Sequence, residues 1–224
     1  MKRHFFDNLE SKTVIVAGGN GLIGSAVVGA LKNCEAKVIN ADIRNPRDEY
    51  LNLSNQANLK IFLDRYYPIG GFVDCTYPKE ILDASENWYR SINLIAEQLS
   101  LNGGSIVCMS SIYGLVGPSM EVYDFNSIHP PTLQYAFCKA GIIGVAKHIA
   151  VKYGKYNVRC NVICPGGVYD RQPQEFVKKY EKRVPMGRMA VPDDIVGAVL
   201  FLISDWSKYI TGAVIPVDGG LTTW

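Results

Sequence analysis

The sequence has little net charge and lacks long apolar runs. Its 224 residues contain 23 Lys and Arg against 21 Asp and Glu, so no strong field attracts nucleic acid or an anionic membrane. No apolar run is long enough to span a bilayer, and residues 1–10 lack the apolar core of a signal peptide. We therefore expect a cytoplasmic protein with no nucleic-acid and no membrane partner.

The sequence also lacks a metal-type pair of cysteines. Its six cysteines lie mostly in apolar stretches without a CxxC spacing, which is typical of small core residues in a reducing compartment. We expect no metal site. Internal repeats and low-complexity linkers are absent from the sequence, and 48% of the residues are hydrophobic. The chain is therefore expected to form one domain over residues 1–224.

A glycine-rich stretch, residues 14–25, organises the chain. A short apolar run leads into Gly18, Gly21 and Gly24, and an amphipathic segment follows. This strand–turn–helix order is the context in which such glycines bind a dinucleotide. Gly18 permits a sharp turn, Gly21 lets the backbone approach a pyrophosphate, and Gly24 permits close packing of the helix. The alternative is an ordinary tight turn.

Asp42 strengthens the dinucleotide interpretation. It ends the next expected strand, residues 37–41, at the distance where an acidic residue binds the adenosine ribose. A carboxylate there repels a ribose phosphate, so NAD is favoured over NADP. Arg44, two residues on, could weaken that preference. The alternative for Asp42 is a solvated strand end.

Apolar strands alternate with helical patterns along the chain. This order predicts an α/β fold: a single-domain Rossmann fold with a doubly wound parallel sheet of about seven strands. Two segments, about 112–133 and 168–185, follow strands and are expected to form the substrate loops. Tyr135 and Lys139 lie four residues apart on a predicted helix, so they share one face, and Ser111 follows an apolar strand.

The chain resembles the short-chain dehydrogenase/reductase family along nearly its whole length. The matching stretches are the glycine loop, Ser-Ile-Tyr-Gly at 111–114, Tyr-Ala-Phe-Cys-Lys-Ala-Gly at 135–141, residues 158–167, Pro-Met-Gly-Arg at 185–188 and Val-Asp-Gly-Gly at 217–220. Tyr77-Pro78, Ser-Ser-Ile-Tyr-Gly at 110–114 and Pro-Gly-Gly-Val-Tyr-Asp at 165–170 are similar to members from flagellin-glycan and sialic-acid-like sugar pathways.

The resemblance implies the catalytic roles. Tyr135 is the general acid/base on the substrate oxygen, and free tyrosine has a pKa of about 10, which Lys139 and the oxidised nicotinamide would lower. Lys139 also holds the nicotinamide ribose, and Ser111 hydrogen-bonds the reacting oxygen. The alternative for Ser111 is a turn cap. The implied cofactor contacts are Gly18, Asn20, Gly21, Leu22, Ile23, Gly24, Asp42, Ile43, Asn52, Leu53, Tyr135, Lys139, Pro165, Gly166 and Val168.

Three features depart from the family pattern. Asp74-Cys75-Thr76-Tyr77 stands where Asn-Asn-Ala-Gly is usual. The helix before Ser111 is expected to be short, so Asn93 is either the supporting catalytic asparagine or an ordinary polar helix residue. Asp170 stands where a threonine usually holds the carboxamide.

The sequence therefore predicts an NAD-dependent oxidoreductase that interconverts a secondary alcohol and a ketone on a small-molecule substrate, a sugar or sugar-nucleotide derivative. The alternative is a catalytically silent sensor or scaffold that keeps the cofactor fold. An anionic substrate would meet Arg171, the best placed of several basic residues in 171–183. Apolar residues Ile142, Ile143 and Val145 on the Tyr135 helix favour a homo-oligomer, a dimer rather than a tetramer, with a changed helix interface.

Overall fold

One parallel sheet forms the centre of the molecule. The computed structural model describes residues 7–44, 49–76 and 81–224, although the side chains of residues 81–86 are not part of the description. Its six strands lie in the order β2-β1-β3-β4-β5-β6. Their bounds are β1 Thr13–Ala17, β2 Lys37–Ala41, β3 Gly71–Asp74, β4 Gly104–Met109, β5 Val158–Pro165 and β6 Val214–Val217.

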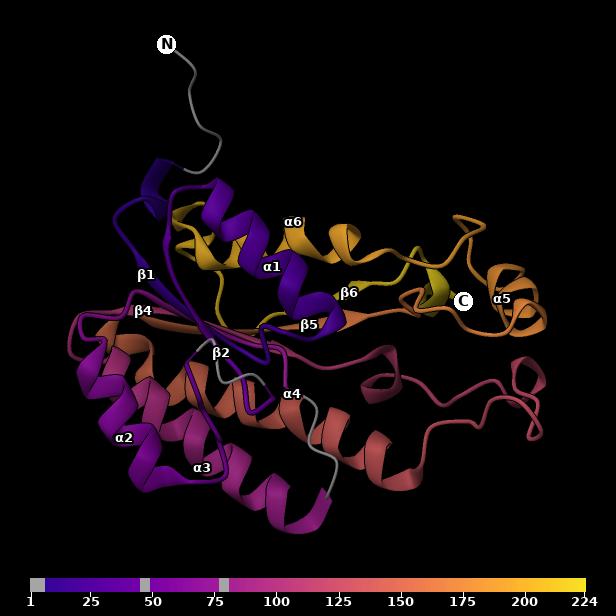
Figure 1. Cartoon of the computed structure of the whole chain (residues 1–224), viewed down its shortest axis with the longest axis horizontal. Helices are drawn as coiled ribbons and strands as arrows, with labels where there is room; N and C mark the ends of the chain where they lie inside the picture. Colours follow the sequence, from indigo (N-terminus) through magenta and orange to yellow (C-terminus); the bar gives the residue numbers. More distant parts are fainter. Residues whose placement is uncertain (1–6, 45–48, 77–80) are drawn as a thin grey trace.

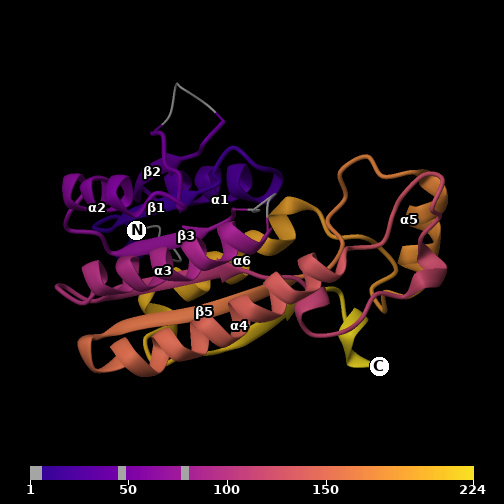
Figure 2. The same cartoon turned by 90° about the horizontal axis from the view of Figure 1, so that it is seen from below.

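Helices cover both faces of this sheet (Figures 1 and 2). One face carries α1 (Leu22–Asn33) and α6 (Pro192–Ile203), and the other carries α2 (Gln56–Arg65), α3 (Ile81–Leu99) and α4 (Leu133–Tyr153). Strand residues alternate between the two apolar cores: Phe72, Ile106 and Cys108 face α2–α4, whereas Val73 and Val107 face α1 and α6. The doubly wound α/β fold is confirmed.

The described sheet has six strands and not the expected seven. Between β2 and α2 the chain adds a single bridge, in which Glu49 pairs with Ala41 in parallel. The backbone of Glu49 accepts from the Asp42 N–H and donates to the Asn40 carbonyl. Seven residues separate Ala41 from Glu49, fewer than the roughly dozen that a crossover to a further parallel strand needs. In the described parts of the chain, β2 is thus an edge strand.

The helix before Ser111 is not short. α3 has 19 residues, close to the 21 of α4. The helix begins at Ile81 and continues to Leu99. Trp88, Ile92, Ile95 and Leu99 of α3 are buried against the sheet, as their spacing predicts.

A smaller lobe lies beyond the carboxyl ends of β4 and β5. Two short turns, η2 (Ile112–Gly114) and η3 (Met120–Val122), precede α4, and α5 (Gln174–Glu181) follows β5. Val122, Phe176 and Tyr180 share a separate apolar cluster, which joins η3 to α5 (Figure 2). The two expected substrate loops therefore pack together at this end of the molecule. None of the helices in the described part of the chain combines the length and apolar content that a membrane crossing requires.

Candidate active site

The glycine turn between β1 and α1 is shaped by close backbone approaches. Gly18 has φ +73°, and a Cβ there would lie 2.7 Å from the Cys75 carbonyl oxygen. A Cβ on Gly24 would lie 2.2 Å from the Gly18 carbonyl oxygen, so the first turn of α1 packs directly on the glycine turn. A side chain on Gly24 would therefore push α1 away from the glycine turn, and one on Gly18 would clash with the backbone that follows β3.

The N-terminus of α1 is open to an anion. Its N-cap residue, Gly21, provides no side-chain cap, and the first turn contains no acidic residue. The N–H groups of Leu22, Ile23 and Gly24 and the helix dipole therefore offer positive charge beyond the sheet edge. Among the described residues, the buried Nδ2 of Asn20 also has no hydrogen-bond partner. An open helix end and an unused donor fit the pyrophosphate of a dinucleotide.

Asp42 lies beside this turn, at the end of β2. Its carboxylate is only 2% exposed and accepts from the backbone N–H of Asn20 (3.1 Å) and of Arg44 (2.9 Å). The Arg44 Nε also donates to it at 3.3 Å, while the Arg44 side chain is 63% exposed. Burial acts to raise the pKa of Asp42, but the hydrogen bonds from Arg44 and Asn20 outweigh it and lower the pKa. The arginine therefore covers the carboxylate that the sequence assigns to the ribose.

Tyr135 and Lys139 lie at the carboxyl end of β4, and Ser111 follows that strand by two residues. The Lys139 Nζ donates to the Met109 carbonyl oxygen at 2.9 Å and lies 5.7 Å from the centroid of the Tyr135 ring. The Ser110 hydroxyl donates to the Lys139 carbonyl at 2.7 Å, which ties α4 to this strand end. A Cβ on Gly114 would lie 2.8 Å from the same carbonyl, so η2 and α4 touch through the glycine.

Two opposing effects act on the pKa of the Lys139 ammonium group. Lys139 is 6% exposed, and its burial lowers the pKa, while the negative field of Asp74 acts in the opposite direction. The Ser111 hydroxyl accepts from the Tyr113 N–H at 3.2 Å. Ser111 therefore does act as a turn cap, which was the alternative to its catalytic role. A hydroxyl that accepts one hydrogen bond still carries its own donor for a substrate oxygen.

Asn93 lies away from this group. Its Oδ1 accepts from the Lys152 Nζ (2.9 Å) and from the Tyr153 hydroxyl (3.1 Å). Tyr153 is the last residue of α4, and at 1.5 Å per residue it lies about 21 Å along the helix axis from Lys139. This position is incompatible with the catalytic role that was expected for Asn93, which is a polar residue of the α3–α4 contact instead.

The remaining expected cofactor residues flank the strand ends. Ile43 is 60% exposed beside Asp42. Asn52 accepts from the Ser54 N–H at 2.9 Å, and the carbonyl of buried Leu53 accepts from the Ser91 hydroxyl, so both residues shape the entry to α2. α2 begins at Gln56, and Asn55 is its N-cap.

The end of β5 supplies the other flank. Pro165 ends the strand, and the N–H of Gly166 donates to the Val217 carbonyl at 2.9 Å. Val168 forms a parallel bridge with Ala190, and within the described residues its N–H has no acceptor. Asp170 stands at the position where the family usually has threonine, and its N–H donates to the Gln172 Oε1 at 2.7 Å. The Val168 N–H is the donor in this loop that fits a carboxamide.

Comparison with known proteins decides the family. The family model described as enoyl-(acyl carrier protein) reductase matches residues 87–222. The chain belongs to the short-chain dehydrogenase/reductase family. A crystal structure of a short chain dehydrogenase from Leptospira borgpetersenii with bound NAD+ superposes with a TM-score of 0.87 at 28% identity, covering 99% of this chain and 97% of that one.

Two curated proteins of the family match over most of their length. Post-translational flagellin modification protein A of Campylobacter coli is 29% identical over 95% of this chain and 98% of its own. L-rhamnose 1-dehydrogenase (NAD(P)(+)) of a Sphingomonas species is 27% identical over 95% and 97%. The resemblance stated from the sequence motifs is thereby confirmed at the level of the family.

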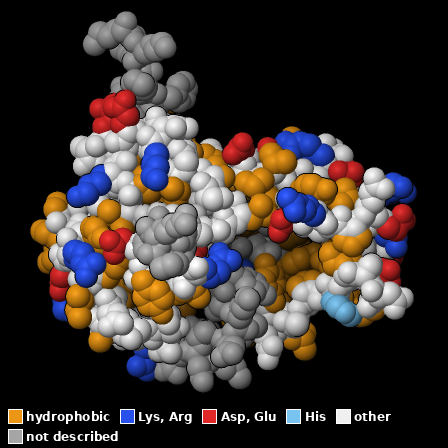
Figure 3. All heavy atoms as spheres, in the orientation of Figure 1, with side chains coloured by type: hydrophobic (Ala, Val, Ile, Leu, Met, Phe, Trp, Pro, Cys, Tyr) orange, Lys and Arg blue, Asp and Glu red, His pale blue; other side chains and the backbone are white. Residues whose placement is uncertain are grey.

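A cluster of tyrosines beside Tyr135 was not predicted from the sequence. The hydroxyl groups of Tyr113 and Tyr123 are hydrogen-bonded to each other, and the Tyr123 ring lies 5.5 Å from that of Phe176. Burial and the bond to Tyr123 raise the pKa of Tyr113, and the field of Arg183 acts against them. The aromatic content of segment 112–133 was the available signal, but spacing alone does not bring Tyr113 and Tyr123 together. Figure 3 shows a hollow with apolar walls between the sheet and this end of the molecule.

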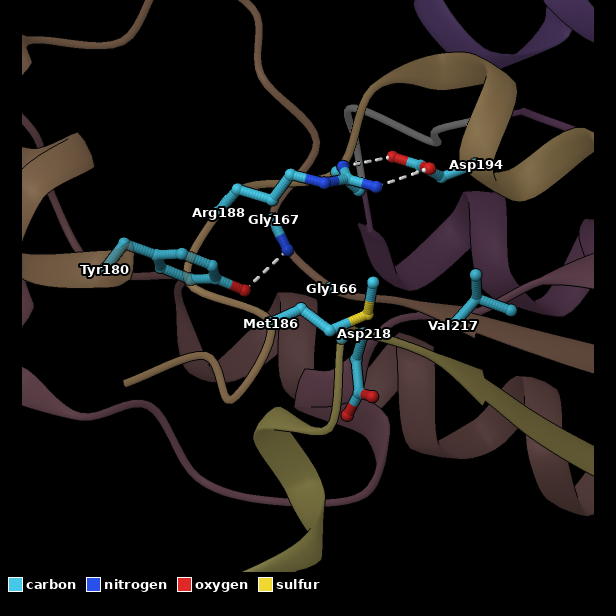
Figure 4. Close-up of a pocket in the computed structure, with 10 residues that line it drawn as sticks. Gly166, Gly167, Tyr180, Met186, Arg188, Asp194, Val217 and Asp218 are labelled. Carbon is cyan, nitrogen blue, oxygen red and sulfur yellow. Dashed lines mark hydrogen bonds and ion pairs between the residues drawn. The ribbon is translucent and has the colours of Figure 1, made fainter. Parts of the chain in front are cut away.

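A pocket of about 240 Å³ lies beyond β5 and β6 (Figure 4). The Tyr180 hydroxyl points to the Gly167 N–H and accepts from it at 2.5 Å, and Arg188 makes two hydrogen bonds to Asp194, at 2.6 and 2.8 Å. These polar groups pair with one another, and Ser111, Tyr135 and Lys139 are not among the residues that line the pocket. The pocket is lined in part by the loop that carries Val168, and it lies apart from the catalytic candidates Ser111, Tyr135 and Lys139.

Proposed function

We propose that this chain is an NAD-dependent dehydrogenase/reductase that interconverts a secondary alcohol and a ketone on a sugar or sugar-nucleotide derivative. One observation carries the proposal: the Lys139 ammonium lies against the Tyr135 ring at the end of β4, on the strand edge that also holds the glycine turn. This is the edge at which open parallel sheets bind ligands.

The proposed mechanism assigns each residue one task. Tyr135 takes the proton from the substrate hydroxyl in oxidation and returns it in reduction. Lys139 stabilises the phenolate of Tyr135 and holds the nicotinamide ribose, and Ser111 donates to the reacting oxygen. When bound, the nicotinamide supplies the hydride chemistry. The open N-terminus of α1 would hold the pyrophosphate of the cofactor, and the Val168 N–H would hold its carboxamide.

A sugar substrate is supported by two kinds of observation. The phenols of Tyr113 and Tyr123 form a hydroxyl pair near Tyr135, which suits a polyhydroxy ligand better than an acyl chain. The two curated relatives named above are a flagellin modification protein and a rhamnose dehydrogenase. The family model, in contrast, is named for acyl-carrier-protein chemistry, so acyl substrates are the necessary comparison.

The test is turnover with a panel. The purified chain is incubated with NAD and sugars or sugar nucleotides, and with NADH and 3-ketoacyl thioesters, while reduced-nicotinamide absorbance is followed. We expect turnover with a sugar derivative. Turnover with acyl thioesters alone would contradict the substrate class. Cofactor binding without turnover of any compound would favour the sensor or scaffold, for which Asp74 in place of the usual asparagine is the supporting observation.

An anionic substrate would meet Arg183 more directly than Arg171. Both arginines are exposed, but the field of Arg183 acts on Tyr113, while Arg171 lies with φ +60° in the loop after β5. For any substrate with a carboxylate or phosphate, Arg183→Ala should raise KM about tenfold, the loss of one hydrogen bond to a charged group. Arg171→Ala is the matched control, and a larger KM effect there would restore it as the anion-binding residue.

A further inference from the structure

Asp74 is a buried carboxylate for which the proposed mechanism has no role. It ends β3 and is 2% exposed. In the sheet it stands in register with Cys108 of β4, and its neighbours two residues away on β3 and β4, Phe72 and Ile106, belong to the core under α3 and α4. Because side chains alternate along a strand, Asp74 faces the layer that contains Lys139.

The Asp74 carboxylate accepts three hydrogen bonds from described residues. One oxygen accepts from the N–H and the hydroxyl of Thr76, at 2.9 and 2.6 Å. The other accepts from the indole Nε1 of Trp88 at 2.5 Å. Trp88 is itself 8% exposed, so it anchors the carboxylate from α3. Three donors around two oxygens hold the carboxylate in a fixed position.

The Lys139 ammonium reaches the same end of β4 from α4. Its Nζ donates to the carbonyl of Met109, the residue next to Cys108, the register partner of Asp74. The negative field of Asp74 raises the pKa of Lys139 against the larger effect of burial, which lowers it. Asp74 and Lys139 therefore oppose each other in one buried region, where screening by solvent is weak.

The other titratable groups that face Lys139 remain neutral near pH 7. Burial raises the pKa of the Cys75, Cys138 and Cys164 thiols, and a hydrogen bond with Cys160 together with burial raises that of Cys108. The phenol of Tyr135, on the same helix, is the group that the mechanism ionises. Among the described residues that act on Lys139, Asp74 thus supplies the full negative charge.

We propose that Asp74 is a positioning residue for the Tyr135–Lys139 pair, a buried counter-charge that keeps the Lys139 ammonium protonated. The inference rests on the proposed function, since it concerns the same acid/base pair. The usual asparagine at this position accepts hydrogen bonds but carries no charge. The aspartate of this chain therefore moves the working pH range of the pair upward.

The test uses Asp74→Asn, which keeps the shape and one acceptor oxygen but removes the charge. Loss of a nearby negative charge makes it easier for Tyr135 and Lys139 to lose their protons. Both limbs of the pH profile of turnover should move to lower pH, by about half a unit or more. Trp88→Phe is the matched control, because it removes a donor from the same carboxylate and leaves the charge, so both limbs should stay in place.

A second readout does not need turnover. The absorbance of tyrosinate is titrated in the cofactor-free protein, and the signal of Tyr135 is obtained by subtracting the titration of Tyr135→Phe. We expect a lower midpoint in the Asp74→Asn background than in the wild type. Unchanged midpoints and pH limbs with a lower melting temperature would overturn the inference and leave Asp74 a purely structural residue.

The two proposals fail in different ways. A shifted tyrosinate midpoint without turnover of any substrate would support Asp74 and contradict the proposed function. Turnover with pH limbs that do not move in Asp74→Asn would support the proposed function and contradict the role of Asp74. If Asp74→Asn does not fold, the Nζ resonance of Lys139 in wild-type protein labelled with [ζ-15N]lysine, assigned with Lys139→Arg, decides. Titration of that resonance below about pH 7 would overturn a counter-charged lysine.

Discussion

The hydroxyl of Tyr135 is the atom on which the proposed chemistry depends. Tyr135→Phe removes this oxygen and leaves the ring against the Lys139 ammonium, 5.7 Å from its centroid. Turnover should fall by about 10²-fold or more, while NAD affinity stays nearly unchanged. Steady-state rates and a calorimetric titration with NAD measure the two quantities. Comparable turnover in the variant would remove Tyr135 from the mechanism.

Lys139→Ala should act differently, because Lys139 has two proposed tasks. It should lower turnover and weaken NAD binding together. The same variant removes the donor to the Met109 carbonyl, so a melting curve must accompany the kinetics. A loss of turnover with full NAD affinity would exclude a role of Lys139 in NAD binding and limit it to its effect on Tyr135.

Asp42 and Arg44 should set the choice of cofactor. Asp42→Ala removes the carboxylate that repels a ribose phosphate and should narrow the preference for NAD over NADP. Arg44→Ala should widen it, because the guanidinium that covers Asp42 is the group available to a phosphate. The ratio of the two dissociation constants, measured for both variants, tests this. An unchanged ratio in Asp42→Ala would place the ribose elsewhere.

At the scale of elements, the start of α6 carries a pH-dependent contact. Asp194 accepts from the Val191 N–H at 2.8 Å, and Pro192 opens the helix as the sequence predicts. The hydrogen bond from Arg188 and that from Val191 lower the pKa of Asp194 to about 2. A carboxyl group with a lowered pKa stabilises the fold above its unfolded pKa, and this contribution disappears as the pH falls toward its folded pKa.

Asp194→Ala should therefore lower the melting temperature at neutral pH. Loss of the bond to the helix N-terminus costs about 1 kcal/mol, which corresponds to roughly 2–4 °C for a chain of this size. The difference between variant and wild type should shrink between about pH 4 and pH 2. Thermal unfolding across that range measures it, and a difference that persists at pH 2 would contradict the assigned contact.

The elements themselves were predictable where their pattern is local. The alternation of apolar strands with helices, the glycine turn and the Pro192 start of α6 all follow from neighbouring residues. The strand count and the length of α3 did not follow. A sheet edge depends on whether a further segment pairs with the outer side of β2, and among the described residues only Glu49 does so.

For the whole molecule, α4 is the surface that predicts assembly. The apolar residues that suggested an interface face inward: Ile142 is buried, and Ile143 and Val145 pack on the core. A different stripe is exposed. Leu133, Phe137 and Val151 are 91%, 66% and 86% exposed, and Gly144 lies on the same side of the helix. We still propose a homo-oligomer, a dimer rather than a tetramer, with this stripe at its centre.

Gly144→Arg should convert the dimer to a monomer. A Cβ at Gly144 meets nothing within 4 Å in the chain, so the substitution disturbs a partner and not the fold. Gly29→Arg on α1 is the matched control, because Gly29 is an exposed helical glycine with equally open space. Light scattering after gel filtration at micromolar concentration measures the mass. A wild-type monomer would contradict the oligomer, and a tetramer would contradict the dimer.

The sequence by itself determined the features that depend on short-range geometry. Gly18 turns the chain with a positive φ, and Gly24 is required by its close approach to Gly18 within the same turn. Tyr135 and Lys139 share a face because a helix brings residues four apart together. These relations hold wherever the local backbone is a strand, a turn or a helix. The family, the doubly wound fold and the positions of the acid/base candidates could therefore be predicted from the chain alone.

Only the tertiary structure decided which distant side chains meet. In the structure, Asn93 contacts the end of α4 that is distant from Lys139, and the hydroxyls of Tyr113 and Tyr123 are hydrogen-bonded to each other. The carboxylate of Asp74 contacts Thr76 and Trp88 and acts on the pKa of Lys139. Each of these relations depends on how helices and loops pack across the sheet. Burial then determines how strongly the charges act on one another, and the spacing of residues along the chain does not show which charged groups are buried together.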